Sequence, residues 1–246
     1  GQLWWYSPII HVTVSNWWDG QWGYRKTITI HHEKVMSNLT HFPLLIHLND
    51  TDIKQHAQLD GDDIVFISQN GQRYPHEIET YDSTTGELIA WVNISSLSNN
   101  IDTNFYMYYG NENVPNQQNP DYVWDTGYKG IWHFHDDFLD STIYDNDGTN
   151  HGSTDNIGWI GDGQYFDGSP DYITAPSHCL GSNHSWTASC WINSNTSSSN
   201  IFHYYISTGQ WNTADAVNIW QNINSPDDLG EMRAQIVDAD GESIDL

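Results

Sequence analysis

The sequence predicts an all-β protein with two β-sandwich domains in tandem and an additional strand at its N-terminal end. The stretch from Asp60 to Trp91 alternates short apolar runs with turn signals, which is the pattern of an antiparallel sheet. Within it, Asn70-Gly71 is the dipeptide that supplies the positive φ angles of a tight hairpin. The 13 Trp and 14 Tyr residues fit β-sandwich cores and subunit interfaces. No catalytic motif interrupts the pattern, so it predicts a scaffold.

Charge and hydropathy exclude two classes of partner. The 246 residues include 32 acidic and 7 basic side chains, a formal net charge of −25. Such a surface repels nucleic acid and anionic lipid, and it suits a cation-rich exterior, bound Ca²⁺ or solubility alone. No run of about 18 apolar residues is present, so we expect no membrane-spanning segment. The start at Gly1, without a basic and apolar leader, leads us to expect a mature, processed product.

Residues 1–16 show the period-two pattern of a strand. Ile10, Val12 and Val14 alternate with polar residues and follow Ile9, which we include in the strand. Pro8 suits the first position of an edge strand. Two interpretations remain open. The strand either pairs inside its own domain or extends from it and adds a strand to a neighbouring subunit.

Strand patterns continue at regular spacing over residues 17–113, which we assign to the first β-sandwich domain. Phe105, Met107 and Tyr109, for example, alternate as in a strand with one apolar face. The stretch Thr51–Gln58 is the one helical window, with its first residue as the candidate cap.

Three segments of this region carry a resemblance: Gly23–Ile30 (GYRKTITI), His41–Phe66 and Glu77–Asn111. In this order they resemble an uncharacterised β-rich domain family of archaeal and bacterial cell-surface proteins, which commonly precedes a laminin-G-like jelly roll. The resemblance implies an extracellular location at the cell surface and a β-rich architecture. It implies no enzymatic activity, because none is assigned to that family.

A polar stretch with two prolines follows, which predicts a linker over residues 114–121. Residues 122–246 then form the second predicted domain. The segments Gly130–Gly152, Ile160–Pro176 and Ser185–Ile192 resemble a laminin-G-like, concanavalin-type jelly roll, with its Asp-rich turn and its Phe-Asp-Gly run in order. The match weakens after Ile206, and a Trp-x-His strand typical of that family is absent from the sequence. The expected jelly roll is therefore compact and divergent, or incomplete.

Five sequons of the form Asn-x-Ser/Thr favour an exported protein with N-linked glycans. They begin at Asn38, Asn49, Asn93, Asn183 and Asn195. The two cysteines, Cys179 and Cys190, predict a disulfide that closes a short loop, a constraint of about 2–3 kcal/mol. Two free buried thiols are the alternative, and the spacing supplies no ligands for a zinc or haem site.

The acidic turns of the second predicted domain contain the candidate metal ligands. These are Asp140, Asp145, Asp147 and Asp167. Carboxylates on Gly-rich turns are ligands that Ca²⁺ uses, whereas Asx-turn hydrogen bonding is the structural alternative. An EF-hand is rejected, because Asn156 occupies the position where its loop needs Glu.

Two further pairs were weighed for chemistry. His133 and His135 are two residues apart, which suits a metal on one strand face, but the sequence identifies no third ligand. Glu77 and Glu79 have the spacing of the paired carboxylates of a jelly-roll glycosidase, yet they lie in the domain whose resemblance implies no such activity. We therefore expect no catalytic residues and no enzyme.

Two functions fit these observations. The first is a non-catalytic extracellular structural subunit that donates its N-terminal strand to another copy of itself, which propagates into a filament or surface layer. The second is a cell-surface adhesin or lectin-like module that binds glycans through jelly-roll loops, with Ca²⁺ as a candidate cofactor. The spare strand supports the first, and the resemblance with its acidic turns supports the second.

Overall fold

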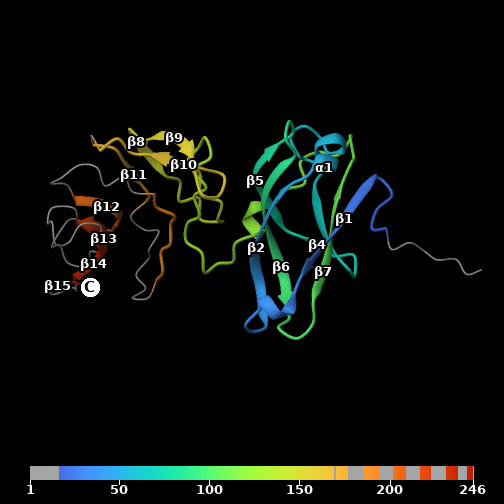
Figure 1. The fold of residues 1–246 in the computed structure, drawn as a ribbon, viewed down its shortest axis with the longest axis horizontal. Coiled ribbons are helices and arrows are strands. Elements are labelled where there is room, and N and C mark those ends of the chain that lie inside the picture. The colour runs from blue at the N-terminus through green and yellow to red at the C-terminus, as the bar shows by residue number, and fades with distance from the viewer. Residues whose placement is uncertain are drawn as a thin grey trace, which may run out of the picture. The chain divides into compact units, whose positions relative to one another are not determined.

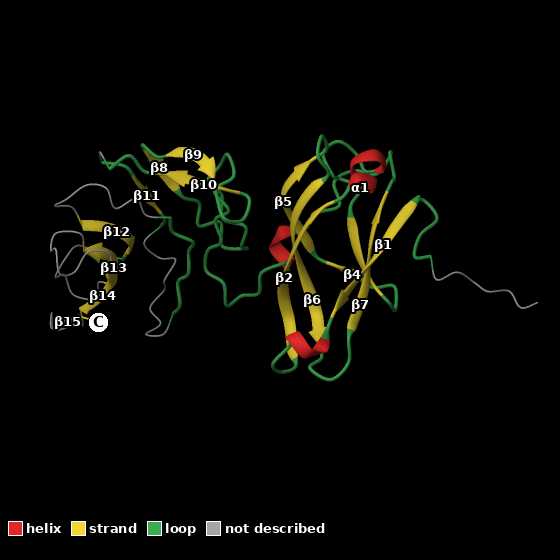
Figure 2. Ribbon diagram, viewed as in Figure 1, coloured by secondary structure: helices red, strands yellow, loops and turns green. Residues whose placement is uncertain are grey.

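A computed structural model describes residues 17–168, 170–176, 186–193, 202–208, 217–222, 231–237 and 243–245. Strands dominate its regular structure, which confirms the predicted all-β class (Figure 2). The chain divides into two compact units, Gly1–Ala175 and Pro176–Leu246. Each unit is described by itself.

Seven strands of the first unit form a β-sandwich of two antiparallel sheets, drawn as two layers in Figure 1. One sheet has the order β1-β7-β3-β4 and the other has the order β2-β6-β5. The strands are β1 (Tyr24–Ile30), β2 (Leu39–Asn49), β3 (Val65–Ser68), β4 (Arg73–Tyr74), β5 (His76–Asp82), β6 (Glu87–Leu97) and β7 (Thr103–Tyr109). Three short helices accompany them, namely η1 (His32–Lys34), α1 (Thr51–His56) and η2 (Pro120–Tyr122).

The core lies between the two sheets because alternate residues of each strand point inward. Phe105, Met107 and Tyr109 of β7 are fully buried, as their alternation predicts. They face Val92 and Ile94 of the central strand β6, which belong to the same buried cluster. A second, smaller cluster covers the outer face of the β1-β7-β3-β4 sheet.

Local sequence signals explain the connections. The Asn70-Gly71 hairpin joins β3 to β4, with Gly71 at φ 85°. Gly86 ends the next turn at φ 83°, where a Cβ atom would lie 2.2 Å from the carbonyl oxygen of Asp50. Helix α1 occupies the predicted window, but Asp50 caps it rather than Thr51: its carboxylate accepts from the N–H groups of Asp52 and Ile53. A carboxylate at the N-terminus also complements the helix dipole.

The predicted linker packs against the sandwich. Gln118 accepts a hydrogen bond at 2.6 Å from the backbone N–H of Ile78, and Asn119 pairs with the backbone of His76. These contacts cover the outer edge of β5, so the segment over residues 114–121 is an ordered part of the first unit. The division between the compact units falls after Ala175 instead of between the two predicted domains.

The rest of the first unit contains two two-stranded sheets, and the second unit contains one four-stranded antiparallel sheet. In the first unit β8 (Thr149–His151) pairs with β11 (Tyr172–Thr174), and β9 (Thr154–Ile157) pairs with β10 (Asp162–Tyr165). In the second unit β12 (Phe202–Ser207), β13 (Val217–Asn222), β14 (Glu231–Val237) and β15 (Ser243–Asp245) follow one another in order.

Candidate functional site

The two sheets of the sandwich end together along the edge formed by β1 and β2, and the core is open there. Neither strand has a partner on its outer side among the described residues. Six of the nine partly buried apolar side chains that pack against the core lie along this edge. They are Ile28, Ile30, Val35, Leu39, Leu44 and Leu48. We call this edge, with these six side chains, the open seam.

The opposite edge of the sandwich is different. The packed residues 117–119 hydrogen-bond to β4 and β5, so the polar groups of that edge have partners. Strand β2 pairs with β6 along all of its length from Leu39 to Asn49 and exposes its other side. Pro43 removes one backbone donor from this edge, and His41 has a φ of 50°, features by which natural edge strands limit uncontrolled pairing.

The described chain begins on the outer face of the β1-β7-β3-β4 sheet. Trp17 packs edge-on against Tyr108 at 5.3 Å between ring centroids, and the backbone N–H of Trp18 donates to the Tyr108 hydroxyl at 3.0 Å. The Arg25 guanidinium lies 5.0 Å from the Trp17 ring. These contacts place the entry of the chain on the outer face of β1 and β7. The predicted N-terminal strand with Ile9, Ile10, Val12 and Val14 lies outside the described residues.

A charged cluster lies on the outer face of the other sheet. Glu77 and Glu79 both project from β5, and His133 lies between them, with Nδ1 3.2 Å from Glu79 Oε2. Its Nε2 is 3.3 Å from Glu77 Oε2, a charge contact outside hydrogen-bond geometry. The three side chains are 3% to 16% exposed. We call them the Glu–His–Glu cluster.

Neutral donors complete this cluster. The indole N–H of Trp91 donates to Glu79 at 2.7 Å, and that of Trp124 donates to Glu77 at 2.9 Å. Ser141 also donates to Glu77. The Trp91 and Trp124 rings approach to 5.2 Å and both lie near the His133 imidazole. The donors therefore come from β6 and from the segment after η2, which the cluster fastens to the sheet.

The pKa shifts follow from this arrangement. Burial alone would lower the pKa of His133, but the two carboxylates raise it to about 9. Burial would raise the pKa of Glu77, whereas His133, Ser141 and Trp124 hold it below its ordinary value. At neutral pH the cluster is an imidazolium between carboxylates whose oxygens already accept hydrogen bonds. Such a group stabilises a junction and is poorly suited to act as a general base.

The sequence pattern indicated the members of this cluster but not their pairing. It placed Glu77 and Glu79 on one strand face, where the structure also has them, and it expected His133 and His135 on a strand. No strand lies between η2 and β8, and His135 instead contacts Asp162 at 2.6 Å. The Glu–His–Glu contact spans more than fifty positions, and only the two-residue spacing of each pair hinted at it.

The structure does not gather the four candidate calcium ligands into one group. Asp140 is 7% exposed, and its oxygens accept from the N–H groups of Ile131, Thr142 and Asn146. Its own N–H donates to Asp147. Asp145 is exposed at φ 50°, and Asp167 follows 22 positions later in another turn beside Asp171. In the described part of the chain no three His, Cys, Asp or Glu side chains could hold a metal ion together. The loop around Asp140 shows the Asx-turn alternative.

The predicted glycosylation sites fall into three groups. Asn38 and Asn49 are exposed. Asn93 is 6% exposed, and its side-chain nitrogen donates to the carbonyl groups of Tyr122 and Val123. A glycan on that nitrogen would break both bonds, so the folded protein does not present Asn93, and this prediction is corrected. The remaining two sequons, at Asn183 and Asn195, lie outside the described residues.

The predicted disulfide is not supported at the cysteine that the structure describes. Cys190 is an exposed free thiol. Its partner in the prediction, Cys179, lies outside the described residues. The alternative of two free buried thiols does not describe Cys190, because this thiol is exposed.

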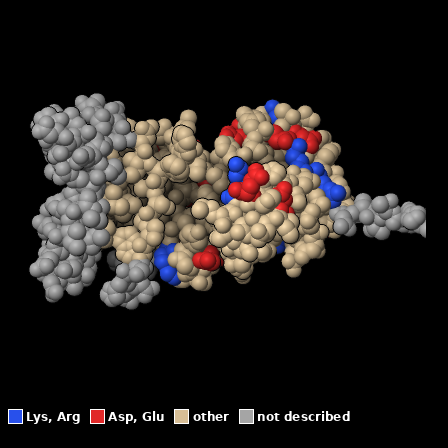
Figure 3. All heavy atoms as spheres, turned by 60° about the horizontal axis from the view of Figure 1, so that its bottom comes forward, with Lys and Arg blue, Asp and Glu red and all other residues tan. Residues whose placement is uncertain are grey.

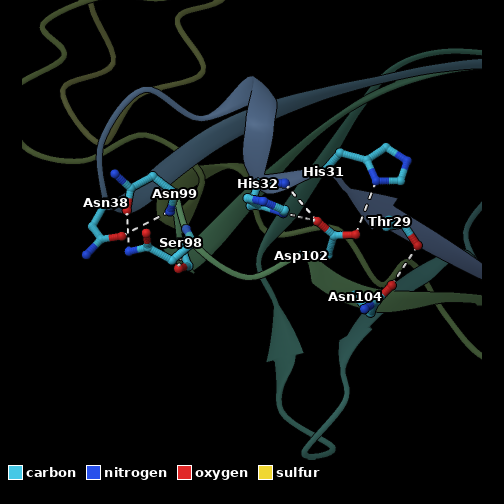
Figure 4. Close-up of polar contacts among 9 residues, drawn as sticks. Thr29, His31, His32, Asn38, Ser98, Asn99, Asp102 and Asn104 are labelled. Carbon is cyan, nitrogen blue, oxygen red and sulfur yellow. Dashed lines mark hydrogen bonds and ion pairs between the residues drawn. The ribbon is translucent and has the colours of Figure 1, made fainter.

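A polar cluster closes the end of the sandwich near Asn38 (Figure 4). Asp102 accepts from the Nδ1 atoms of His31 and His32, at 3.2 and 2.7 Å, and from the backbone N–H of His32. That backbone N–H and the imidazoles hold the pKa of Asp102 at about 2. Asn38 accepts from the backbone N–H of Asn99 beside it. Because the Nδ1 atoms of both imidazoles contact the same carboxylate, the cluster stabilises the β1–η1 turn.

The charged side chains are distributed over the surface without forming one acidic field on the face drawn in Figure 3, where basic groups lie among acidic ones and most atoms are uncharged. Every helix in the described part of the chain falls short of the length and apolarity that spanning a membrane requires.

Comparison with known families gives one match. Residues 60–159 match the model of DUF2341, a domain of unknown function. The match covers less than half of the chain, and it agrees with the expected resemblance to an uncharacterised β-rich domain. It begins five residues before β3 and ends two residues after β9, so it includes the packed segment and the Glu–His–Glu cluster. No jelly-roll family was identified. No curated protein and no solved structure is significantly similar to this chain.

Proposed function

We propose that the protein is a non-catalytic structural subunit of an extracellular assembly, in which each copy inserts its N-terminal strand into the open seam of the next. The observation that carries this proposal is the open seam itself. Both sheets end there without an outer partner among the described residues, and six apolar side chains are left partly buried. A strand with apolar residues at every second position would cover them and satisfy one sheet edge.

The chain supplies a strand of this kind. Ile10, Val12 and Val14 alternate with polar residues, so one face of the strand is apolar. The Trp17 and Trp18 contacts fix the chain on the outer face of the β1-β7-β3-β4 sheet. To reach the seam of its own copy, the N-terminal strand would have to turn back around β1 within a few residues. Insertion into the seam of a neighbouring copy requires no such turn. This favours exchange between copies, and a head-to-tail contact that does not close propagates into a filament.

Two further features are part of the proposal. We assign Asn38 and Asn49 as the N-glycosylation sites of the first unit, because both are exposed. We keep the laminin-G-like jelly roll as the architecture of the region after residue 122, on the resemblance of its Asp-rich turn and Phe-Asp-Gly run alone.

The test is negative-stain electron microscopy of the whole chain and of a chain lacking residues 1–16. We expect filaments from the first and dispersed, folded particles from the second. Val12→Asp should behave like the deletion because it places a charge on the apolar face. Thr13→Asp adds the same charge to the polar face and should still assemble. Dispersed particles of the whole chain, or a truncated chain that fails to fold, would contradict the proposal.

A further inference from the structure

A pocket of about 550 Å³ opens on the sandwich, lined by residues of β2, β4, β6 and η2 and of the short segments beside them. Its floor includes Asn93 and Ser95, which alternate along β6 with the inward-pointing Val92 and Ile94 and therefore face outward. Arg73 and Tyr122 line it from β4 and η2. The remaining lining residues are His41, Gln72, Tyr74 and Pro75.

The charge of this pocket is opposite to that of the chain. None of its eight lining residues is acidic, although the chain has 32 acidic and 7 basic side chains. The one guanidinium is held in place: Arg73 donates to the side chain of Gln117 at 2.8 Å and also to its carbonyl oxygen. A guanidinium has five N–H donors in a fixed fork, so further donors remain to meet a carboxylate.

The pocket also has an exposed aromatic side chain in its lining, that of Tyr122. The Tyr122 side chain is 68% exposed, whereas its backbone is fixed at both polar groups. Its N–H donates to the carbonyl of Asn119 at 3.2 Å, and its carbonyl accepts from Asn93 at 2.9 Å. The two backbone bonds fix where the ring begins, and the exposed ring offers an apolar face beside Arg73. It is the geometry that suits stacking against a flat, partly apolar ligand such as a pyranose ring.

We propose that this pocket binds a carboxylated saccharide, a hexuronic acid unit of a glycan. The carboxylate lies on Arg73, the sugar ring stacks on Tyr122, and the hydroxyl groups of the sugar bond to Ser95, Gln72 and His41. A single guanidinium matches one carboxylate, while several neutral polar groups match a ligand rich in hydroxyls. The site shares His41 with β2, one of the two strands of the open seam, and needs no calcium ion, in contrast to glycan binding through acidic jelly-roll loops.

Isothermal titration calorimetry of the whole chain tests this proposal, with trigalacturonate as the acidic probe and maltotriose as the neutral one. We expect the acidic probe to bind more tightly, and Arg73→Gln to weaken its binding by about tenfold or more. Lys54→Gln removes the same charge from α1, at the far end of β6 from Ser95, and should bind as the wild type does. Tyr122→Ala should lose affinity by about tenfold, whereas Tyr122→Phe keeps the ring and should retain it.

Three results would overturn the proposal. Equal affinity for both probes, or no measurable binding of either, removes the carboxylate preference. If Arg73→Gln and Lys54→Gln bind the acidic probe equally well, Arg73 does not contact its carboxylate. Loss of binding on addition of a calcium chelator places the site elsewhere. Circular dichroism spectra of every variant must match the wild type, and Arg73→Lys, which keeps the charge, should bind better than Arg73→Gln.

Discussion

Replacing His133 by leucine is expected to lower the free energy of unfolding by about 3–5 kcal/mol, the range found when one member of a buried ion pair is removed. The variant leaves the carboxylates of Glu77 and Glu79 without a cation at positions that are 12% and 3% exposed. It also removes the charged contact between the sheet and the segment after η2, which Trp124 and Ser141 continue to join to Glu77. Urea denaturation followed by tryptophan fluorescence at pH 7 measures the change.

A matched control tests whether the loss of stability comes from the burial of the charges or from the removal of any His–Glu contact. His47 Nε2 and Glu87 Oε1 lie 3.0 Å apart, but their side chains are 52% and 41% exposed. His47→Leu should therefore change stability by no more than about 1 kcal/mol. A triple variant, His133→Leu with Glu77→Gln and Glu79→Gln, removes the stranded charges and should recover part of the loss. A triple variant that is less stable than His133→Leu alone would contradict this account.

The second large effect is on the pH dependence of stability. The pKa of His133 rises from 6.5 to about 9 on folding, so its stabilisation is complete below pH 6.5 and is lost as the pH rises through about 9. The full effect is about 3 kcal/mol. The pKa of Glu77 is lowered from 4.5, so its contribution is present above that value and is lost on acidification.

These two groups together place the maximum contribution of the cluster between about pH 4.5 and pH 6.5. The groups that face His133 are the carboxylates Glu77 and Glu79 and the uncharged rings of Trp91 and Trp124. Thermal unfolding from pH 4 to pH 10 measures the profile. The alkaline fall between pH 7 and pH 10 should be much smaller in the His133→Leu variant, and an unchanged fall would show that another group causes it.

The sequence predicted those features whose cause is local. The alternation around Met107 and the Asn70-Gly71 hairpin depend on residues close together in the chain, and both have the expected structure. The window of α1 was also found, although the capping residue was misplaced by one position, since Asp50 and Thr51 are both good caps and only the backbone decides between them.

Features that depend on distant contacts were missed or misjudged. The pairing of His133 with β5 requires the topology of the sheet and the path of the chain after η2. The Asn-x-Ser pattern at Asn93 does not reveal whether the side chain is buried. In the structure, the Asn93 side-chain nitrogen donates to the carbonyl groups of Tyr122 and Val123. The polar composition of residues 114–121 suggested a linker, but its Gln and Asn side chains instead bond to the edge of β5. Polar side chains can hold a segment against a sheet through hydrogen bonds as well as leave it in solvent.

The measurement that tests the open seam most directly is a disulfide cross-link between two copies. One chain carries Val12→Cys and another carries Leu44→Cys, in a background where Cys179 and Cys190 are replaced by serine. A disulfide requires the two Cα atoms to lie within about 7 Å of each other. We expect a covalent dimer when the two chains are mixed before assembly and none from either chain alone. A mixture that stays uncrosslinked, while a chain with both cysteines closes on itself as a monomer, would contradict strand exchange between copies.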